Sequence, residues 1–182
     1  MAPAVAAFMP VSAPLRTSRT FIVAGARFIG LCKLLADAAD NAISVFELLT
    51  RGLRQSGDEA WLDESEDALI ELATHWRQFE TTPDSGLADF SDTDQDFLEC
   101  VPAYRGVVAG INAANAYMMR EVGTLLRTSS ASKSAQLMSL ADRVSAATIR
   151  RLYRPEDGFF SCLTNGLKDN TTVGVPTVVD FV

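Results

Sequence analysis

Residues 103–127 of this chain read AYRGVVAGINAANAYMMREVGTLLR, and they carry a clear helical signal. Their apolar side chains recur at intervals of three and four residues, which places them on one face of an α-helix. That face consists of Val107, Ile111, Ala114, Met118, Val122 and Leu125. Small residues beside it leave room for a second helix to approach closely, namely Gly106, Gly110, Ala113 and Ala114.

The same periodicity continues on both sides of this segment. We expect further helices at about residues 22–38, 41–55, 63–79 and 133–152. Asp63 and Glu66 form a capping-box-like start for the third of these. After a turn at residues 154–158 the chain is short and extended. The sequence therefore predicts an all-α fold of antiparallel helix hairpins with a short extended C-terminal segment.

The N-terminal tail allows two interpretations. Residues 1–20 are rich in Ala, Ser, Thr, Pro and Arg, a composition typical of an organelle transit peptide. The alternative is a loose, flexible tail before a slightly basic first helix. Arg27 interrupts the apolar run that follows, which argues against a secretory signal and, with Lys33, against a membrane-spanning helix. We expect a cytoplasmic or organellar rather than a secreted protein.

The helical domain is expected to occupy residues 21–182. Nearly half of the residues (48%) are apolar, which is enough for a buried core. The extreme C-terminus, residues 178–182, is apolar and extended, whereas chain ends usually fray into solvent. This pattern indicates that the sequence stops inside a larger domain.

The chain is acidic, with 23 Asp and Glu against 16 Lys and Arg and a net charge of −7. Binding to nucleic acid or to an anionic membrane surface requires clustered basic residues, so we expect neither partner. The acidic excess is local, because residues 78–104, here called the acidic segment, contain no Lys or Arg. That segment holds Glu80, Asp84, Asp89, Asp92, Asp94, Asp96 and Glu99.

Several kinds of catalytic site find no support in the sequence. The three Cys are far apart, the single His is His75, and no CxxC or phosphate-binding glycine motif is present. The alternating aspartates of residues 92–96 have the spacing of a calcium loop. However, Phe97 stands where that loop requires Gly and Ala103 where it requires Glu, so a solvated acidic loop is preferred. We therefore expect no metal and no cofactor.

Carboxylate chemistry is the remaining catalytic option. Glycoside hydrolysis needs two carboxyl groups, one as a proton donor and one as a base or nucleophile. The acidic segment supplies carboxylates, and nearby aromatic side chains supply surfaces on which sugars stack. These aromatic residues are Trp76, Phe90, Phe97 and Tyr104. On these facts alone a charged surface loop without catalysis is the preferred interpretation.

Several short stretches share their order and spacing with motifs of one enzyme family. They are residues 56–62 (SGDEAWL), 82–89 (TPDSGLAD), 101–105 (VPAYR) with 112–118 (NAANAYM), 152–160 (LYRPEDGFF) and 179–181 (VDF). Together they resemble the six-hairpin, or α/α toroid, glycoside hydrolases. That group includes the processing α-glucosidases and the mannosylglycerate hydrolases.

The resemblance implies part of an α/α toroid, a carbohydrate substrate and a set of site residues. Asp89 matches the general acid, and Glu99 is the candidate second carboxylate, with Asp96 and Asp84 as alternatives. Substrate-binding roles fall to Trp76, Tyr104, Arg105, Asn112 and Asn115.

The chain is shorter than a complete toroid, whose second carboxylate comes from a later hairpin. We therefore expect weak glycosidase activity, or none, from this chain alone, and self-association through exposed hairpin faces. The alternative function is a non-catalytic, all-helical binding or scaffold protein.

Overall fold

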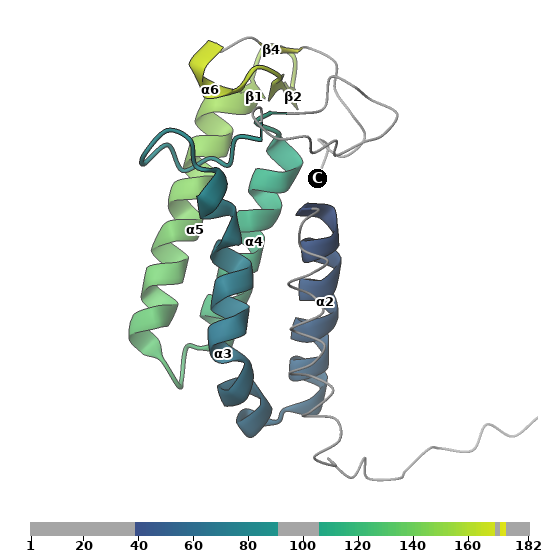
Figure 1. Cartoon of the computed structure of the whole chain (residues 1–182), viewed down its shortest axis with the longest axis vertical. Coiled ribbons are helices and arrows are strands. Elements are labelled where there is room, and N and C mark those ends of the chain that lie inside the picture. Colours follow the sequence, from purple (N-terminus) through teal and green to yellow (C-terminus); the bar gives the residue numbers. More distant parts are fainter. Residues whose placement is uncertain (1–38, 91–105, 170–171, 174–182) are drawn as a thin grey trace, which may run out of the picture.

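The computed structural model describes residues 39–90, 106–169 and 172–173 (Figure 1). Its long helices are α2 (Ala39–Ser56), α3 (Glu59–Thr74), α4 (Ala109–Leu125) and α5 (Ala131–Leu152), and a 3-10 helix, η1 (His75–Phe79), continues α3. The C-terminal part contains β1 (Tyr153–Arg154), β2 (Phe159–Phe160), β3 (Cys162–Leu163), α6 (Gly166–Asp169) and β4 (Thr172–Val173). The described part is mostly helical, so the all-α prediction is confirmed at that level.

Some sequence predictions fall outside the described residues. They are the tail at residues 1–20, the helix at 22–38, the aspartates of 92–96 and the C-terminal end at 178–182. Three candidate site residues lie there too, namely Glu99, Tyr104 and Arg105.

The four long helices run side by side and alternate in direction, so that α2–α3 and α4–α5 form two antiparallel hairpins (Figure 1). The turns within both hairpins lie at one end of the bundle. At the other end, β1 pairs with β2 and β3 pairs with β4, both antiparallel. Val107, just before α4, forms a further antiparallel bridge with Leu163 of β3.

Helix α3 begins earlier than the sequence predicted, so its expected start at Asp63 is wrong. Its N-cap is Asp58, whose carboxylate accepts hydrogen bonds from the backbone N–H groups of Ala60 (3.0 Å) and Trp61 (3.1 Å). Gly57 adopts a φ of +61° and ends α2 directly before this cap. The turn between α2 and α3 is therefore very short, and Asp63 lies inside the helix.

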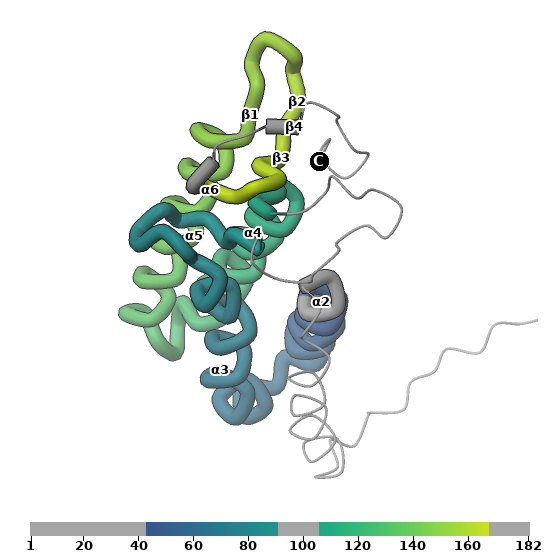
Figure 2. Tube along the Cα trace, turned by 45° about the horizontal axis from the view of Figure 1, so that its top comes forward, coloured from purple at the N-terminus to yellow at the C-terminus, as the bar shows by residue number. Residues whose placement is uncertain are grey.

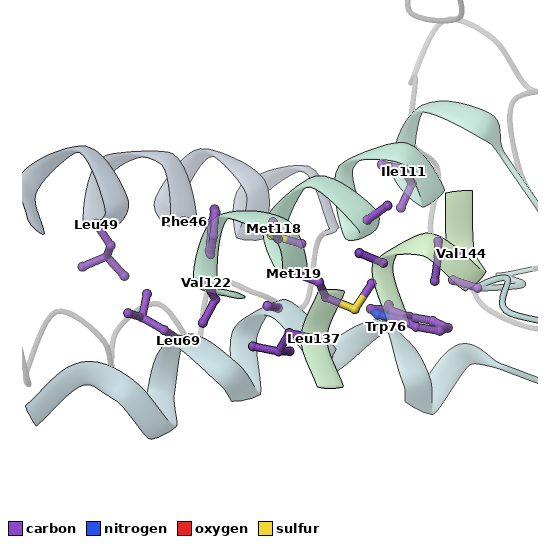
Figure 3. Packing of buried hydrophobic residues seen from close by; sticks show 14 of the residues in the cluster. Phe46, Leu49, Leu69, Trp76, Ile111, Met118, Met119, Val122, Leu137 and Val144 are labelled. Carbon is purple, nitrogen blue, oxygen red and sulfur yellow. The ribbon is translucent and has the colours of Figure 1, made fainter. Parts of the chain in front are cut away.

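The main hydrophobic core lies between all four helices (Figure 3). Each helix contributes large buried side chains, including Phe46, Leu49, Leu69, Trp76, Met119, Val122, Leu137 and Val144. Burial of one such side chain contributes about 1.5–3 kcal/mol. A second, smaller cluster lies at the end of the bundle that carries the four strands, and it contains Leu87, Val107, Leu152 and Leu163.

The buried face of α4 differs from the predicted stripe. Ala114 and Leu125 are only partly buried, whereas Ala116 and Met119 are buried completely or nearly so. Helices α2, α3 and α5 all contact α4, so its buried surface extends further around the helix than one stripe. The prediction that Ala113 lies at a close helix contact is also wrong, because that residue is exposed.

A close contact between α4 and α5 lies at Gly123 instead. A Cβ atom added there would lie 3.3 Å from Met138 Cγ and 3.3 Å from the Ser134 carbonyl oxygen. The buried Ser134 hydroxyl donates a hydrogen bond of 2.6 Å to the Gly123 carbonyl. A side chain at this position would force its neighbours on α5 to shift, so the close contact favours glycine.

Candidate functional site

The described part of the acidic segment is a loop, residues 80–90, that follows η1 and lies beside α5 (Figures 1 and 2). A Cβ atom added at Gly86 would lie 3.3 Å from Ala147 Cβ and 3.4 Å from Arg143 Cγ, so the loop backbone touches α5 directly. The Gly86 N–H donates a hydrogen bond of 2.7 Å to the Glu80 carboxylate, which closes the loop on itself. Residues 86–90 are buried.

Asn112 fixes the middle of this loop to the first turns of α4. Its Oδ1 accepts a hydrogen bond of 2.8 Å from the Ala88 N–H, and its Nδ2 donates one of 3.3 Å to the Ala88 carbonyl. Nδ2 also donates a bond of 2.9 Å to the Val108 carbonyl. The side chain is fully buried. Both amide hydrogens of Asn112 are therefore committed to the backbone rather than directed at a ligand.

Asp89, the predicted general acid, fixes the end of the loop to the C-terminal part of the chain. Its Oδ2 accepts hydrogen bonds from the Leu167 N–H (3.0 Å), at the start of α6, and from the Thr81 hydroxyl (3.2 Å). Its own N–H donates to the Phe79 carbonyl at 2.8 Å. Only 3% of Asp89 is exposed to solvent. The carboxylate thus joins two segments that are far apart in sequence.

Gly106 brings a third segment to the same place. It has a φ of +79°, and a Cβ atom added there would lie 2.2 Å from the Leu163 carbonyl oxygen. Its carbonyl accepts a hydrogen bond of 3.0 Å from the Phe90 N–H, and Val107 and Leu163 exchange two backbone hydrogen bonds. Residues 80–90, 106–108 and 161–167 therefore meet at one end of the bundle, here called the loop end.

Two further candidate residues that the structure describes, Trp76 and Asn115, are located in the helical core. Trp76 is 3% exposed and Asn115 is 5% exposed. Neither the indole Nε1 of Trp76 nor the amide Nδ2 of Asn115 has a hydrogen-bond partner in the described structure. The indole is therefore not on a surface where a sugar ring could stack, and the Asn115 amide is not on a surface where it could bond to sugar hydroxyls.

The contacts made by the candidate residues were only partly foreseeable from the sequence. Asn112 is hydrogen-bonded to Ala88, and Asp89 is the next residue in the loop. The two candidate residues therefore lie in the same region, as a shared site requires. The sequence interpretation missed Thr81 and the Leu167 N–H, both of which donate hydrogen bonds to Asp89. A usable signal was Asn112 itself, because a polar residue beside the apolar face of a helix needs buried partners.

A second polar feature, missed by the sequence interpretation, joins α2 to α4. It consists of Glu47, Arg54, Tyr117 and Glu121 and is here called the α2–α4 seam. The Tyr117 hydroxyl donates a hydrogen bond to the Glu47 carboxylate, which raises the pKa of Tyr117 to about 12 and lowers the pKa of Glu47. Arg54 forms an ion pair with Glu121, and the ring of Phe46 meets that of Tyr117 edge to face at 6.4 Å.

The described residues form neither a metal-binding cluster nor a membrane-spanning helix. Within residues 39–90 and 106–169, no group of three or more His, Cys, Asp and Glu side chains is arranged to hold a metal ion. No helix among the described residues combines the length and the apolar character needed to cross a bilayer. The expectations of no metal and no membrane partner remain predictions for the whole chain.

Comparisons with known proteins find no match among protein-family models, curated proteins or solved structures. The resemblance to six-hairpin glycoside hydrolases therefore depends on the short stretches quoted above. It remains a prediction, and so do the roles it implies for individual residues.

Proposed function

We propose that the described part of this chain is a non-catalytic helical scaffold or binding module, in which the loop of residues 80–90 is a structural element. The observation that carries the proposal is the environment of Asp89. A general acid must carry a proton and reach the leaving oxygen of its substrate. Asp89 is instead buried, and its Oδ2 accepts hydrogen bonds from the Leu167 N–H and the Thr81 hydroxyl.

The other described carboxylates of the loop also have partners within the chain. Glu80 accepts a hydrogen bond from the Gly86 N–H. Asp84, whose φ is +57°, forms a solvent-exposed ion pair with Arg143 at 3.4 Å. The Glu80 contact closes the loop on itself, whereas the exposed Asp84–Arg143 pair contributes little to stability. Both contacts stay within the chain, which supports a structural role for the loop.

Glycoside hydrolysis is the competing hypothesis. It would use Asp89 and Glu99 as the carboxylate pair within an arc of an α/α toroid. For that function the loop end must open to admit a carbohydrate, since Asp89 and Trp76 are 3% exposed. The two hypotheses therefore predict opposite consequences of changing Asp89.

The test compares the whole chain with its Asp89→Asn variant, on unactivated disaccharides and on activated aryl glycosides. We expect no turnover by either protein. We also expect the variant to lose about 1–3 kcal/mol of stability, because an amide NH₂ replaces a buried acceptor oxygen. Asp84→Asn is the matched control in the same loop. Its side chain is exposed, and we expect a change within about 0.5 kcal/mol.

The result that overturns the proposal is turnover of disaccharides that falls about 10²–10⁴-fold in Asp89→Asn and less for aryl glycosides. Thermal unfolding, followed by circular dichroism, provides the stability measurement. Equal stability of Asp89→Asn and the wild-type chain would also contradict a structural role for this carboxylate.

A further inference from the structure

We propose that Trp76 Nε1 and Asn115 Nδ2 donate hydrogen bonds to one shared acceptor, a water molecule bound inside the helical core. The two side chains are 97% and 95% buried, since 3% and 5% of their surfaces are exposed. Both nitrogen atoms are without a hydrogen-bond partner in the described structure. Buried N–H groups in folded proteins are almost always paired, and leaving one unpaired is costly. Two such donors in one core therefore point to a bound acceptor.

The positions of the two residues suit a shared acceptor. Trp76 comes from η1, and Figure 3 shows its indole beside the side chains of Met119 and Val144, which belong to the same hydrophobic cluster. Asn115 precedes Met119 by four residues on α4, so the two side chains lie on the same side of that helix, one turn apart. The indole and the amide therefore border the same part of the core.

The chemistry of the two donors identifies the kind of acceptor. Both groups are neutral N–H donors, which suit a neutral oxygen atom. A water molecule accepts two hydrogen bonds, and its own hydrogens can reach helix carbonyl oxygens, each of which keeps a second lone pair. Asn112, three residues before Asn115, does not compete for this role, because its amide is bonded to Ala88 and Val108.

The direct test is nuclear magnetic resonance on the wild-type chain, with water as the probe. The chain has two Trp, and the indole N–H signal that disappears in Trp76→Phe belongs to Trp76. We expect a cross-relaxation peak between this proton and water, with the sign of a long-lived bound water, and its loss in Asn115→Leu. Trp61, which is partly exposed, is the internal control. A folded wild-type chain without the Trp76 peak would overturn the proposal.

A thermodynamic cycle tests whether the two donors share one acceptor. Trp76→Phe and Asn115→Leu should each lower the melting temperature by about 2–4 °C or more. The double variant should lose clearly less than the sum, because either single change already removes the shared water. The control cycle pairs Trp61→Phe with Asn115→Leu and should be additive. Additive losses in the Trp76–Asn115 cycle, or single variants as stable as the wild-type chain, would contradict a shared acceptor.

Discussion

The contacts of α4 with its two neighbours, α5 and α2, follow different physical principles. Against α5, the backbones approach closely at Gly123, and the buried Ser134 hydroxyl bonds directly to the facing carbonyl. Against α2, large side chains such as Phe46 fill the space, and the polar groups of the α2–α4 seam line its edge. The α4–α5 contact depends on the missing side chain of Gly123, whereas the α4–α2 contact depends on large side chains that fill the space between the helices. We expect the first to tolerate added volume poorly and the second to respond to pH and salt.

The largest expected effect is at the close contact. Gly123→Val adds methyl groups where even a Cβ lies 3.3 Å from Met138 and from the Ser134 backbone. We expect a loss of about 3 kcal/mol from overpacking, measured by urea unfolding. Thr124→Val, on the exposed face of the same helix, should change stability by about 0.5 kcal/mol or less. If Gly123→Val is as stable as the wild-type chain, the two helices do not approach as described.

A smaller effect is expected from the hydroxyl that joins the two backbones. Ser134→Ala removes the 2.6 Å hydrogen bond to the Gly123 carbonyl without adding volume. The loss should be about 1 kcal/mol. Ser132→Ala, at an exposed position in the first turn of α5, serves as the control and should be nearly neutral. Identical unfolding midpoints for the two variants would show that the buried hydrogen bond contributes no net stability.

The stability contributed by the α2–α4 seam should change more at high pH than on removal of the Tyr117 hydroxyl at neutral pH. The folded pKa of Tyr117, about 12, exceeds its ordinary value of 10 because of the hydrogen bond to Glu47. Its stabilising contribution is thus fully present below about pH 10 and is lost as the pH rises through about 12. Tyr117→Phe should cost about 0.5 kcal/mol at neutral pH, since the ring is 40% exposed.

The ultraviolet absorbance of tyrosinate measures the titration of Tyr117 directly. The chain has only three Tyr, so their phases can be separated. We expect a phase that titrates late in the wild-type chain and disappears in Tyr117→Phe. In Glu47→Gln the same phase should shift toward the ordinary pKa. An unchanged titration curve in Glu47→Gln would show that the hydrogen bond to Glu47 does not raise the pKa of Tyr117.

The smallest expected effects come from the ion pairs that bridge each contact. Arg54 pairs with Glu121 across the seam, and Arg120 pairs with Asp142 between α4 and α5 at 2.7 Å. Arg54→Gln and Arg120→Gln should each cost less than about 0.5 kcal/mol, and high salt should reduce both losses. Arg54→Gln should cost more, because the Glu121 side chain is 17% exposed and that of Asp142 is 68% exposed. The reverse order would show that burial of the acid does not set the strength of the pair.

The sequence predicted the helices well and their contacts less well. Periodicity located α2 and α5 to within two residues, because it reflects local geometry. The predicted start of the α4 helix at residue 103 is wrong: α4 begins six residues later, at Ala109, and Val107 forms a β-bridge with Leu163 instead of lying on the helix. The sequence also suggested small residues at a close helix contact. It did not identify Gly123 as that contact, since the rotation of a helix depends on how many neighbours cover it. The start of α3 was missed because two acidic residues, Asp58 and Asp63, each had the local features of a cap.

The candidate site was the least predictable part. The motif around Asp89 predicted a catalytic carboxylate, and it did not indicate that Thr81 and Leu167 donate hydrogen bonds to that carboxylate. Every residue except proline has a backbone N–H group, so the identity of Leu167 does not predict that it donates to Asp89. Burial of Trp76 and Asn115 likewise depends on the packing of distant helices. Spacing along the chain does not contain this information.

The hydrogen bond between Asp89 and Leu167 joins residues that are 78 positions apart. Bringing together the ends of so long a stretch of chain costs more conformational entropy than closing a short turn, and it is slower for that reason. Helices α4 and α5 are joined by a short turn, so we expect them to meet early. We therefore expect the loop end to assemble after the α4–α5 hairpin, so that its contacts form late in folding. Substitutions at Asp89 should for this reason act mainly on the rate of unfolding and leave the rate of folding nearly unchanged.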